Sequence, residues 1–266
     1  MSGRQLREIA HETVEILGRG WYQAPGAGQV TLSQEIAAAV AGTRLYLPED
    51  ELAPPAQPAT GTVVEVTGET TLAAARRLGG DVAALVFASA KNPGGGFLSG
   101  AQAQEEALAR ASALYTCQTA AGEFYDFHRH QRDLRYSDRV IYSPAVPVFR
   151  ADDGTLLGQR YLVSFLTAAA PNLRAIRSNG HGTQDSVPAV LARRAARVLQ
   201  VAAAHRHRRL VLGAWGCGVF GNDPALVAAI FADLLPEHSA FDHVVFAVYD
   251  ARPGAPAYQA FAEVFA

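Results

Sequence analysis

The sequence predicts an α/β protein in which a largely parallel or mixed sheet is covered by helices on both faces. Beyond about residue 60, short apolar stretches alternate with helical ones, the usual order of strands and crossover helices in such proteins. Two strand candidates, 210–212 and 244–248, are apolar throughout, as expected of strands buried on both faces. We therefore expect a three-layer α/β/α arrangement, with a helical extension at the N-terminus.

The N-terminal extension is expected to contain two helices. Residues 4–17 place apolar side chains on one helical face, and Gly18 would end that helix. A second helix is expected to start at Ser33, a residue suited to the N-cap, and to end at Gly42.

Four prolines between residues 48 and 60 cannot continue a helix or a central strand, so this stretch is interpreted as a linker. We therefore expect a helical accessory segment with its linker over 1–58, and an α/β domain over 59–266.

The strands and helices of the second domain follow from the alternating pattern. The sequence does not decide whether the stretch 124–136 forms a lid or a solvated loop. Strands are expected at 62–66, 82–88, 139–142, 161–167, 209–214 and 243–249. Helices are expected at 70–78, 101–120, 187–204, 223–235 and 256–265.

Composition excludes several classes of protein. A net charge of −2 argues against sequence-independent binding of DNA or RNA. No apolar run reaches the roughly 18 residues that span a bilayer, and no signal peptide is visible. Cys117 and Cys217 form neither a disulfide framework nor a zinc motif. We expect a cytoplasmic monomer without metal or cofactor.

The most informative stretch is residues 91–106, where three glycines precede Gln104, Glu105 and Glu106 by seven residues. Glycines let a backbone pass close to a ligand. Neighbouring helical residues point about 100° apart, but at a first turn both glutamates can still reach a ligand across the helix end. A site that hydrolyses a phosphorylated sugar or nucleotide is one interpretation, and a pair of solvated first-turn glutamates is the other.

The two interpretations differ in the pKa that they require. A helix N-terminus lowers the pKa of a carboxyl group, whereas a general acid at neutral pH needs a raised one. Burial together with a like-charged neighbour would supply that rise.

A second glycine-rich loop spans 213–222, directly after the apolar strand stretch 210–212. Its residues 216–221 match the G-x-G-x-x-G pattern of dinucleotide-binding proteins. However, only one strand candidate follows, and no acidic residue ends it at the required spacing. The remaining expectation is a cradle for a diphosphate, formed by backbone N–H groups near a helix N-terminus.

Three segments together resemble the bacterial-type poly(ADP-ribose) glycohydrolases. They are 88–96 (ASAKNPGGG) followed by QEE at 104–106, 213–220 (GAWGCGVF) and 142–150 (YSPAVPVFR). The resemblance covers about residues 60–250 and implies a macrodomain-like fold. It also implies hydrolysis of the ribose–ribose bonds of poly(ADP-ribose), mainly from chain ends, with the polymer or ADP-ribosylated proteins as partners.

The resemblance further implies roles for single residues. Glu106 would act as general acid and then as general base, while Glu105 and Asn92 would hold the ribose hydroxyls. Gln104 would fix the loop that contains Gly94, Gly95 and Gly96. Five residues of the second loop would wrap the diphosphate: Gly216, Gly218, Val219, Phe220 and Gly221. Phe220 would also pack on the distal ribose. Adenine would lie near Glu69 and Thr70, stacked on Tyr249.

Two other functions remain open at this point. A macrodomain can bind ADP-ribose without cleaving it, but such a reader needs no acid at the ribose. A nicotinamide-dependent oxidoreductase would use the glycines of 216–221.

Overall fold

The computed structural model describes residues 1–54, 61–179, 183–238 and 240–266. Within these ranges a seven-stranded mixed sheet runs in the order β3-β6-β7-β5-β8-β9-β4, and β1 and β2 form a separate hairpin. No helix in the described ranges is long and apolar enough to cross a membrane. The strands are β1 Trp21–Ala24, β2 Gly28–Thr31, β3 Arg44–Tyr46, β4 Val63–Thr67, β5 Val82–Phe87, β6 Val140–Arg150, β7 Leu156–Ala168, β8 Arg209–Leu212 and β9 His243–Ala247.

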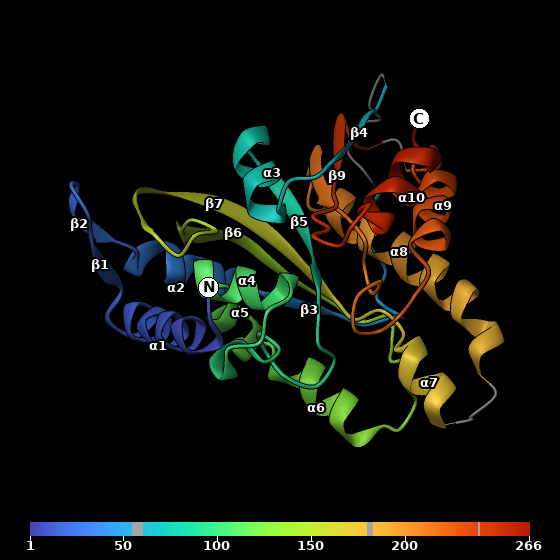
Figure 1. Cartoon of the computed structure of the whole chain (residues 1–266), viewed down its shortest axis with the longest axis horizontal. Helices are drawn as coiled ribbons and strands as arrows, with labels where there is room; N and C mark the ends of the chain where they lie inside the picture. The colour runs from blue at the N-terminus through green and yellow to red at the C-terminus, as the bar shows by residue number, and fades with distance from the viewer. Residues whose placement is uncertain (55–60, 180–182, 239) are drawn as a thin grey trace.

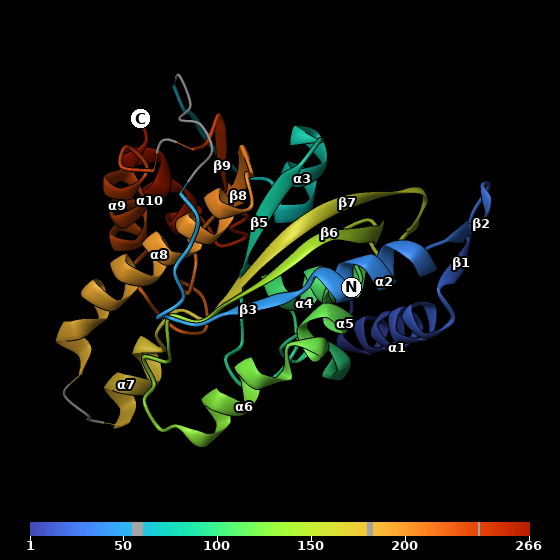
Figure 2. The same ribbon diagram turned by 180° about the vertical axis from the view of Figure 1, so that it is seen from behind.

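Helices cover both faces of this sheet, as Figures 1 and 2 show. One face packs on α8, α9 and α10, and the other on α1 to α5, which gives two extensive apolar cores. This confirms the expected three-layer α/β/α class. The helices are α1 Gly3–Arg19, α2 Ser33–Gly42, α3 Thr71–Leu78, α4 Gln104–Ala111, α5 Leu114–Ala120, α6 Gly122–His130, α7 Leu173–Asn179, α8 Val187–Ala204, α9 Pro224–Leu234 and α10 Pro256–Val264, with short 3₁₀ turns at Phe97–Ser99 and Gln184–Ser186.

Five neighbouring strands of the sheet are parallel. Strands β7, β5, β8, β9 and β4 all point the same way, whereas β6 and β3 run antiparallel to their neighbours. The carboxyl ends of the five parallel strands therefore meet at one edge of the sheet. Ligands of open α/β sheets bind beyond this edge.

The ends of the two N-terminal helices differ in detail from expectation. Helix α1 continues past Gly18, because its cap is Gly20, whose φ of 77° provides the left-handed turn that ends many helices. Helix α2 starts at Ser33 as expected, but the N-cap position is occupied by Leu32. The Ser33 hydroxyl instead donates to the carbonyl of Gly20 at 3.1 Å, and so ties the two helices together.

The N-terminal segment also contains strands that were not expected. Strand β3 pairs with β6 at the edge of the main sheet, so this segment adds to the same layers as the rest of the chain. The predicted boundary between residues 58 and 59 lies outside the described residues and stays a prediction.

The helix expected at 101–120 is divided into α4 and α5. Ser112 between them is extended, with φ −146°, and bridges Val148 of β6. Its hydroxyl donates to the carbonyl of Leu108 and accepts from the N–H of Leu114, so it closes one helix and starts the next. The open stretch at 124–136 begins as helix α6.

Candidate active site

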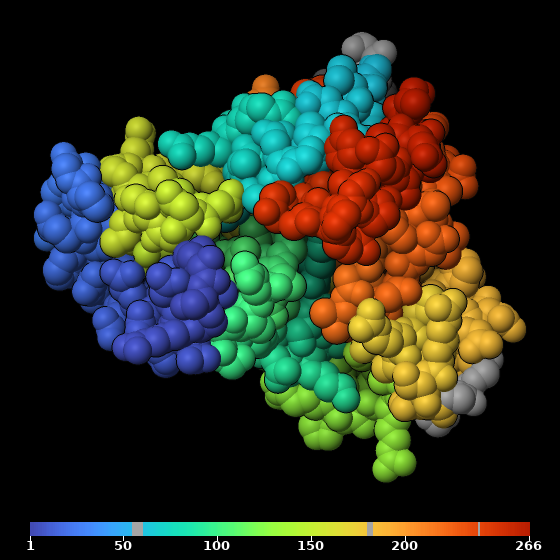
Figure 3. All heavy atoms as spheres, viewed as in Figure 1, coloured from blue at the N-terminus to red at the C-terminus, as the bar shows by residue number. Residues whose placement is uncertain are grey.

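The two glycine-rich loops lie side by side at the carboxyl edge of the sheet. One follows β5 and the other follows β8, and these strands are parallel neighbours. In Figure 3 the surface is hollowed between the green atoms of α4 with its preceding loop and the orange and red atoms of the C-terminal part. Segments that contain the two glycine-rich loops therefore flank a single hollow of the surface.

Gln104 fixes the start of α4 to the end of β5. Its side-chain oxygen accepts from the N–H of Phe87 at 2.9 Å, and its amide nitrogen donates to the carbonyl of Leu85 at 2.7 Å. The same nitrogen also donates to the hydroxyl of Thr71 in α3, at 3.1 Å. Gln104 thus joins the strand, the first turn of α4 and a neighbouring helix.

Glu105 is buried, and protein groups hold both of its carboxylate oxygens. Oε2 accepts from the N–H of Ser89 at 2.6 Å, and Oε1 accepts from the side-chain amide of Gln118 at 2.9 Å. The orientation of this carboxyl group is therefore set before any ligand arrives.

Gln118 is a site residue that sequence reasoning missed. It is fully buried in α5, and its side-chain oxygen accepts from the N–H of Gly94 at 2.8 Å while its nitrogen holds Glu105. One amide thereby connects the glycine-rich loop to the buried glutamate. The available signal was a lone amide directly after Leu114 and Cys117, on a helix face that buries apolar side chains.

Glu105 and Glu106 converge on the backbone of Gly95, despite their different directions on the helix. Glu106 is partly exposed, and its Oε1 accepts from the N–H of Gly96 at 3.0 Å. A Cβ atom at Gly95 would lie 2.4 Å from this oxygen and 3.0 Å from Oε2 of Glu105. Glycine is needed here both for that approach and because its φ is +58°.

Burial raises the pKa of Glu105 from 4.5 to about 8, and the charge of neighbouring Glu106 adds to the rise. The hydrogen bonds from Ser89 and Gln118 act in the opposite direction, because they stabilise the carboxylate. At neutral pH the Glu105 carboxyl group is therefore mostly protonated. A buried neutral acid lies beside a partly exposed glutamate.

This raised pKa predicts a distinct pH dependence of stability. The unfolded chain releases the proton near pH 4.5 and the folded protein only near pH 8, so the contribution of Glu105 to the free energy of unfolding falls as the pH rises between these values. Between pH 5 and 8, wild type should lose about 1 kcal/mol per pH unit more than Glu105→Gln, which cannot ionise. Urea unfolding of both proteins across this range measures the difference, and parallel curves would contradict the raised pKa.

The second loop is fastened at its base and exposed at its tip. At its base, Asn222 donates through its side-chain amide to the carbonyls of Pro171 at 2.9 Å and Gly216 at 3.1 Å. At its tip, Val219 is 71% exposed, whereas Phe220 is half-buried. A Cβ atom at Gly218 would meet no atom within 4 Å, so the backbone there is open to a ligand.

The predicted adenine residues also follow strands at this edge. Tyr249 comes after β9 and is 69% exposed, so its ring is accessible for stacking. Thr70 caps α3 and donates to the carboxylate of Asp152 at 2.6 Å. The carboxylate of Glu69 is held by Arg77, at 2.8 Å, which lowers the pKa of Glu69. Glu69 and Thr70 thus already have protein partners, whereas Tyr249 presents an open ring.

The remaining predicted residue, Asn92, is exposed in the first loop. Its carbonyl accepts from the N–H of Gly95 at 3.0 Å, so its backbone supports the turn while its side chain faces solvent. Across the described ranges, no three His, Cys, Asp or Glu side chains come together in a way that could hold a metal ion.

Comparisons with known proteins show that this chain is similar to enzymes of one activity. Residues 10–151 match the family described as microbial-type PARG, catalytic domain. The crystal structure of poly(ADP-ribose) glycohydrolase (PARG) from Thermomonospora curvata is 55% identical, with coverage of 98% of this chain and 100% of that one, and a TM-score of 0.91.

Two ligand complexes are similar as well. The Thermomonospora curvata enzyme bound to the inhibitor ADP-HPD is 56% identical, covering 98% of this chain and 99% of that one, with a TM-score of 0.90. The PARG from Deinococcus radiodurans in complex with ADP-ribose is 46% identical, covering 86% and 96% of the two chains, with a TM-score of 0.80. No curated protein sequence matched the chain significantly.

Proposed function

The chain belongs to the microbial-type poly(ADP-ribose) glycohydrolases, and from this membership we propose that Glu106 is the acid with which it cleaves poly(ADP-ribose). The protein is a glycosidase that hydrolyses the ribose–ribose bonds of this polymer. The observation that carries the assignment is the convergence of Glu105 and Glu106 on Gly95, one of them buried and the other partly exposed.

The proposed reaction uses Glu106 twice. Its Oε1 is held by Gly96, whereas its Oε2 has no hydrogen bond to the part of the chain that the structure describes and can face a ligand. As general acid, Glu106 would give a proton to the ribose oxygen that leaves the scissile bond, and an oxocarbenium-like ribose would form. Glu106, now a carboxylate, takes a proton from the water that attacks this ribose, which restores the acid.

Glu105 would serve a different purpose in the same site. Both of its oxygens already accept from Ser89 and Gln118, so the neutral carboxyl group would use its proton to donate to a ribose hydroxyl, and Asn92 would help to hold the sugar. Retaining glycosidases place two carboxyl groups on either side of the scissile bond, and this adjacent pair departs from that scheme.

The second loop would supply the diphosphate site. Its backbone is open at Gly218 and lies ahead of α9, where N–H groups and the helix dipole favour an anion. Gly216 and Gly221, on either side of Gly218, would complete the cradle. Val219 and Phe220 would wrap the diphosphate, Phe220 would also pack on the distal ribose, and Tyr249 would stack on adenine. We further propose that the enzyme acts as a monomer, mainly from chain ends, on the polymer or on ADP-ribosylated proteins.

A product assay tests the function. Purified protein mixed with poly(ADP-ribose) should release free ADP-ribose, measured by chromatography, and should shorten the polymer. A reader of ADP-ribose would bind the polymer and release nothing. An oxidoreductase that uses the 216–221 glycines would reduce NAD with some substrate, and the same preparation should show no such reduction.

A further inference from the structure

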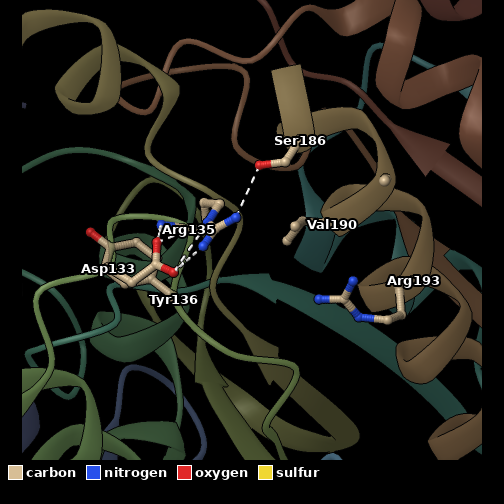
Figure 4. Close-up of a pocket in the computed structure, with 7 residues that line it drawn as sticks. Asp133, Arg135, Tyr136, Ser186, Val190 and Arg193 are labelled. Atoms are coloured by element: carbon tan, nitrogen blue, oxygen red, sulfur yellow. Dashed lines mark hydrogen bonds and ion pairs between the residues drawn. The ribbon is translucent and has the colours of Figure 1, made fainter. Parts of the chain in front are cut away.

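A cavity of about 250 Å³ lies beside the second loop and has no role in the reaction described above. It is formed between the segment that follows α6 and the first turns of α8. Figure 4 shows charged side chains on opposite sides of it, with apolar atoms of α8 between them. The lining residues are Asp133, Arg135, Tyr136, Ser186, Ala189, Val190 and Arg193.

The cavity wall is joined to the second loop. The ring of Tyr136 lies 5.9 Å from the ring of Phe220, measured between centroids. The N–H of Arg174 donates to the carbonyl of Phe220, and the N–H of Asn172 donates to that of Leu134, both at 2.9 Å. Hydrogen bonds thus connect the cavity, the start of α7 and the loop proposed to hold the diphosphate.

The backbone of Tyr136 is strained at this junction. Its φ is +61°, a left-handed conformation that costs a non-glycine residue roughly 1–2 kcal/mol. Its N–H donates to the carbonyl of Asp133 at 3.1 Å, which closes the turn. Strain of this kind is often kept where a side chain must be aimed at a ligand.

One guanidinium group of the cavity is held in place from two sides. Arg135 binds the carboxylate of Asp133 through two nitrogens, at 3.0 and 2.7 Å, and donates through its third to the hydroxyl of Ser186 at 3.1 Å. Arg135 is therefore preorganised, and its charge is balanced by Asp133.

Arg193 supplies a positive charge and N–H donors that a ligand could bind. Its Nε binds Asp138, but its two terminal nitrogens have no hydrogen-bond partner among the residues that the structure describes. In Figure 4 the guanidinium group of Arg193 extends over the cavity toward Tyr136. Asp138 is shared with the buried Arg194, at 2.9 Å, so the two arginines together keep one positive charge in excess.

We propose that this cavity binds phosphate groups of the ADP-ribose unit on the leaving side of the scissile bond. The inference rests on the proposed function, which packs Phe220 on the distal ribose, the sugar to which the next unit is attached. A guanidinium fork with free nitrogens suits a phosphate, because two parallel N–H donors match two phosphate oxygens. The cavity is smaller than the pockets of whole drug-sized ligands, and suits a diphosphate or a ribose phosphate.

Two substrates separate this subsite from the catalytic groove. One is poly(ADP-ribose), and the other is ADP-ribose linked to p-nitrophenol, whose leaving group carries no phosphate. With Arg193→Glu we expect kcat/KM for the polymer to fall about tenfold, mainly through KM, because a reversed charge repels the phosphates. With Arg193→Ala the fall should be smaller. Both variants should keep the p-nitrophenyl activity and the Kd for free ADP-ribose within about twofold, since neither ligand reaches the cavity.

A matched control is Arg208→Ala. Arg208 also forms a surface ion pair with an aspartate, Asp242, but it precedes β8 and lies at the opposite edge of the sheet. This variant should cleave both substrates as wild type does. Arg193 is 61% exposed, and Asp138 keeps its second partner Arg194, so the Arg193 variants should fold normally, as circular dichroism can verify.

The outcomes distinguish the two proposals. If wild type cleaves the polymer and Arg193→Glu has unchanged polymer kinetics, the subsite is refuted while the function stands. An equal loss on both substrates would also refute it, because the change would then act through the catalytic groove. If wild type cleaves neither substrate, the proposed function itself fails.

Discussion

Replacing Glu106 with glutamine should lower the rate of polymer hydrolysis by about 10³-fold and leave ADP-ribose binding almost unchanged. The amide cannot protonate the leaving oxygen or accept a proton from water, so both steps lose their catalyst. Its side-chain oxygen can still accept from the N–H of Gly96, so the shape of the site should persist. The rate of ADP-ribose release gives kcat, and calorimetry gives the Kd for ADP-ribose.

The control for this change is Glu8→Gln. Glu8 is an exposed glutamate on α1 that pairs with Arg4, and its replacement should alter neither quantity. Undiminished hydrolysis by Glu106→Gln would show that another group is the acid. Loss of ADP-ribose binding would show instead that Glu106 mainly holds the ligand.

Replacing Gly95 with alanine should lower kcat by about 100-fold, because both carboxyl groups would have to move. The new Cβ would lie 2.4 Å from Oε1 of Glu106 and 3.0 Å from Oε2 of Glu105, well inside normal contact distances. The positive φ of Gly95 adds a backbone cost of roughly 1 kcal/mol or more. We expect a fall in kcat together with a modest loss of thermal stability, measured by the Tm.

The variant Gly26→Ala separates the clash with the two glutamates from the backbone cost of a positive φ. Gly26 also has a positive φ, 72°, but a Cβ atom there would meet nothing within 4 Å. Its replacement should lower the Tm by a similar backbone contribution and leave kcat unchanged. If Gly95→Ala behaves like Gly26→Ala, the close approach of the two glutamates has no part in catalysis.

Much of the fold could be predicted from local pattern. The strands β4, β5, β8 and β9 coincide with apolar stretches, and the crossover helices start and end near recognisable signals such as Asp223 before Pro224. The placement of both loops on one edge also followed, because each comes directly after a parallel strand. Periodicity is strongest where a strand or helix is buried along its length.

Other features depend on contacts between distant residues, and no local signal contains them. Strand β3 is three residues long and exists because β6 pairs with it. Helix 101–120 is divided because Ser112 bridges β6. The amide of Gln118 becomes a site residue only because α5 packs beneath the glycine-rich loop.

The pKa values of the glutamate pair also depend on packing that the local sequence does not show. The sequence led us to expect that burial and a charged neighbour would raise a carboxyl pKa in the glutamate pair. The structure assigns the burial to Glu105, and the raised pKa with it. Which of two adjacent glutamates faces inward depends on the direction of α4 relative to β5, and that direction is fixed by Gln104.

The hydrogen bonds of the first turn of α4 also affect which changes in the length of the preceding loop this enzyme can tolerate. Gln104, Glu105 and Glu106 each bind back to the chain before them, at Phe87, Ser89 and Gly96, so the loop is fastened at both ends. Only residues 97–103 lie between the last of these anchors and the helix. Phe97 is buried and begins a 3₁₀ turn, so insertions fit best at the exposed positions 102–103. Lengthening a loop there changes its closure entropy little and should leave the anchored ends in register. A deletion would shorten the span that these anchors must bridge, so natural or engineered variation in length should accumulate as insertions in this segment.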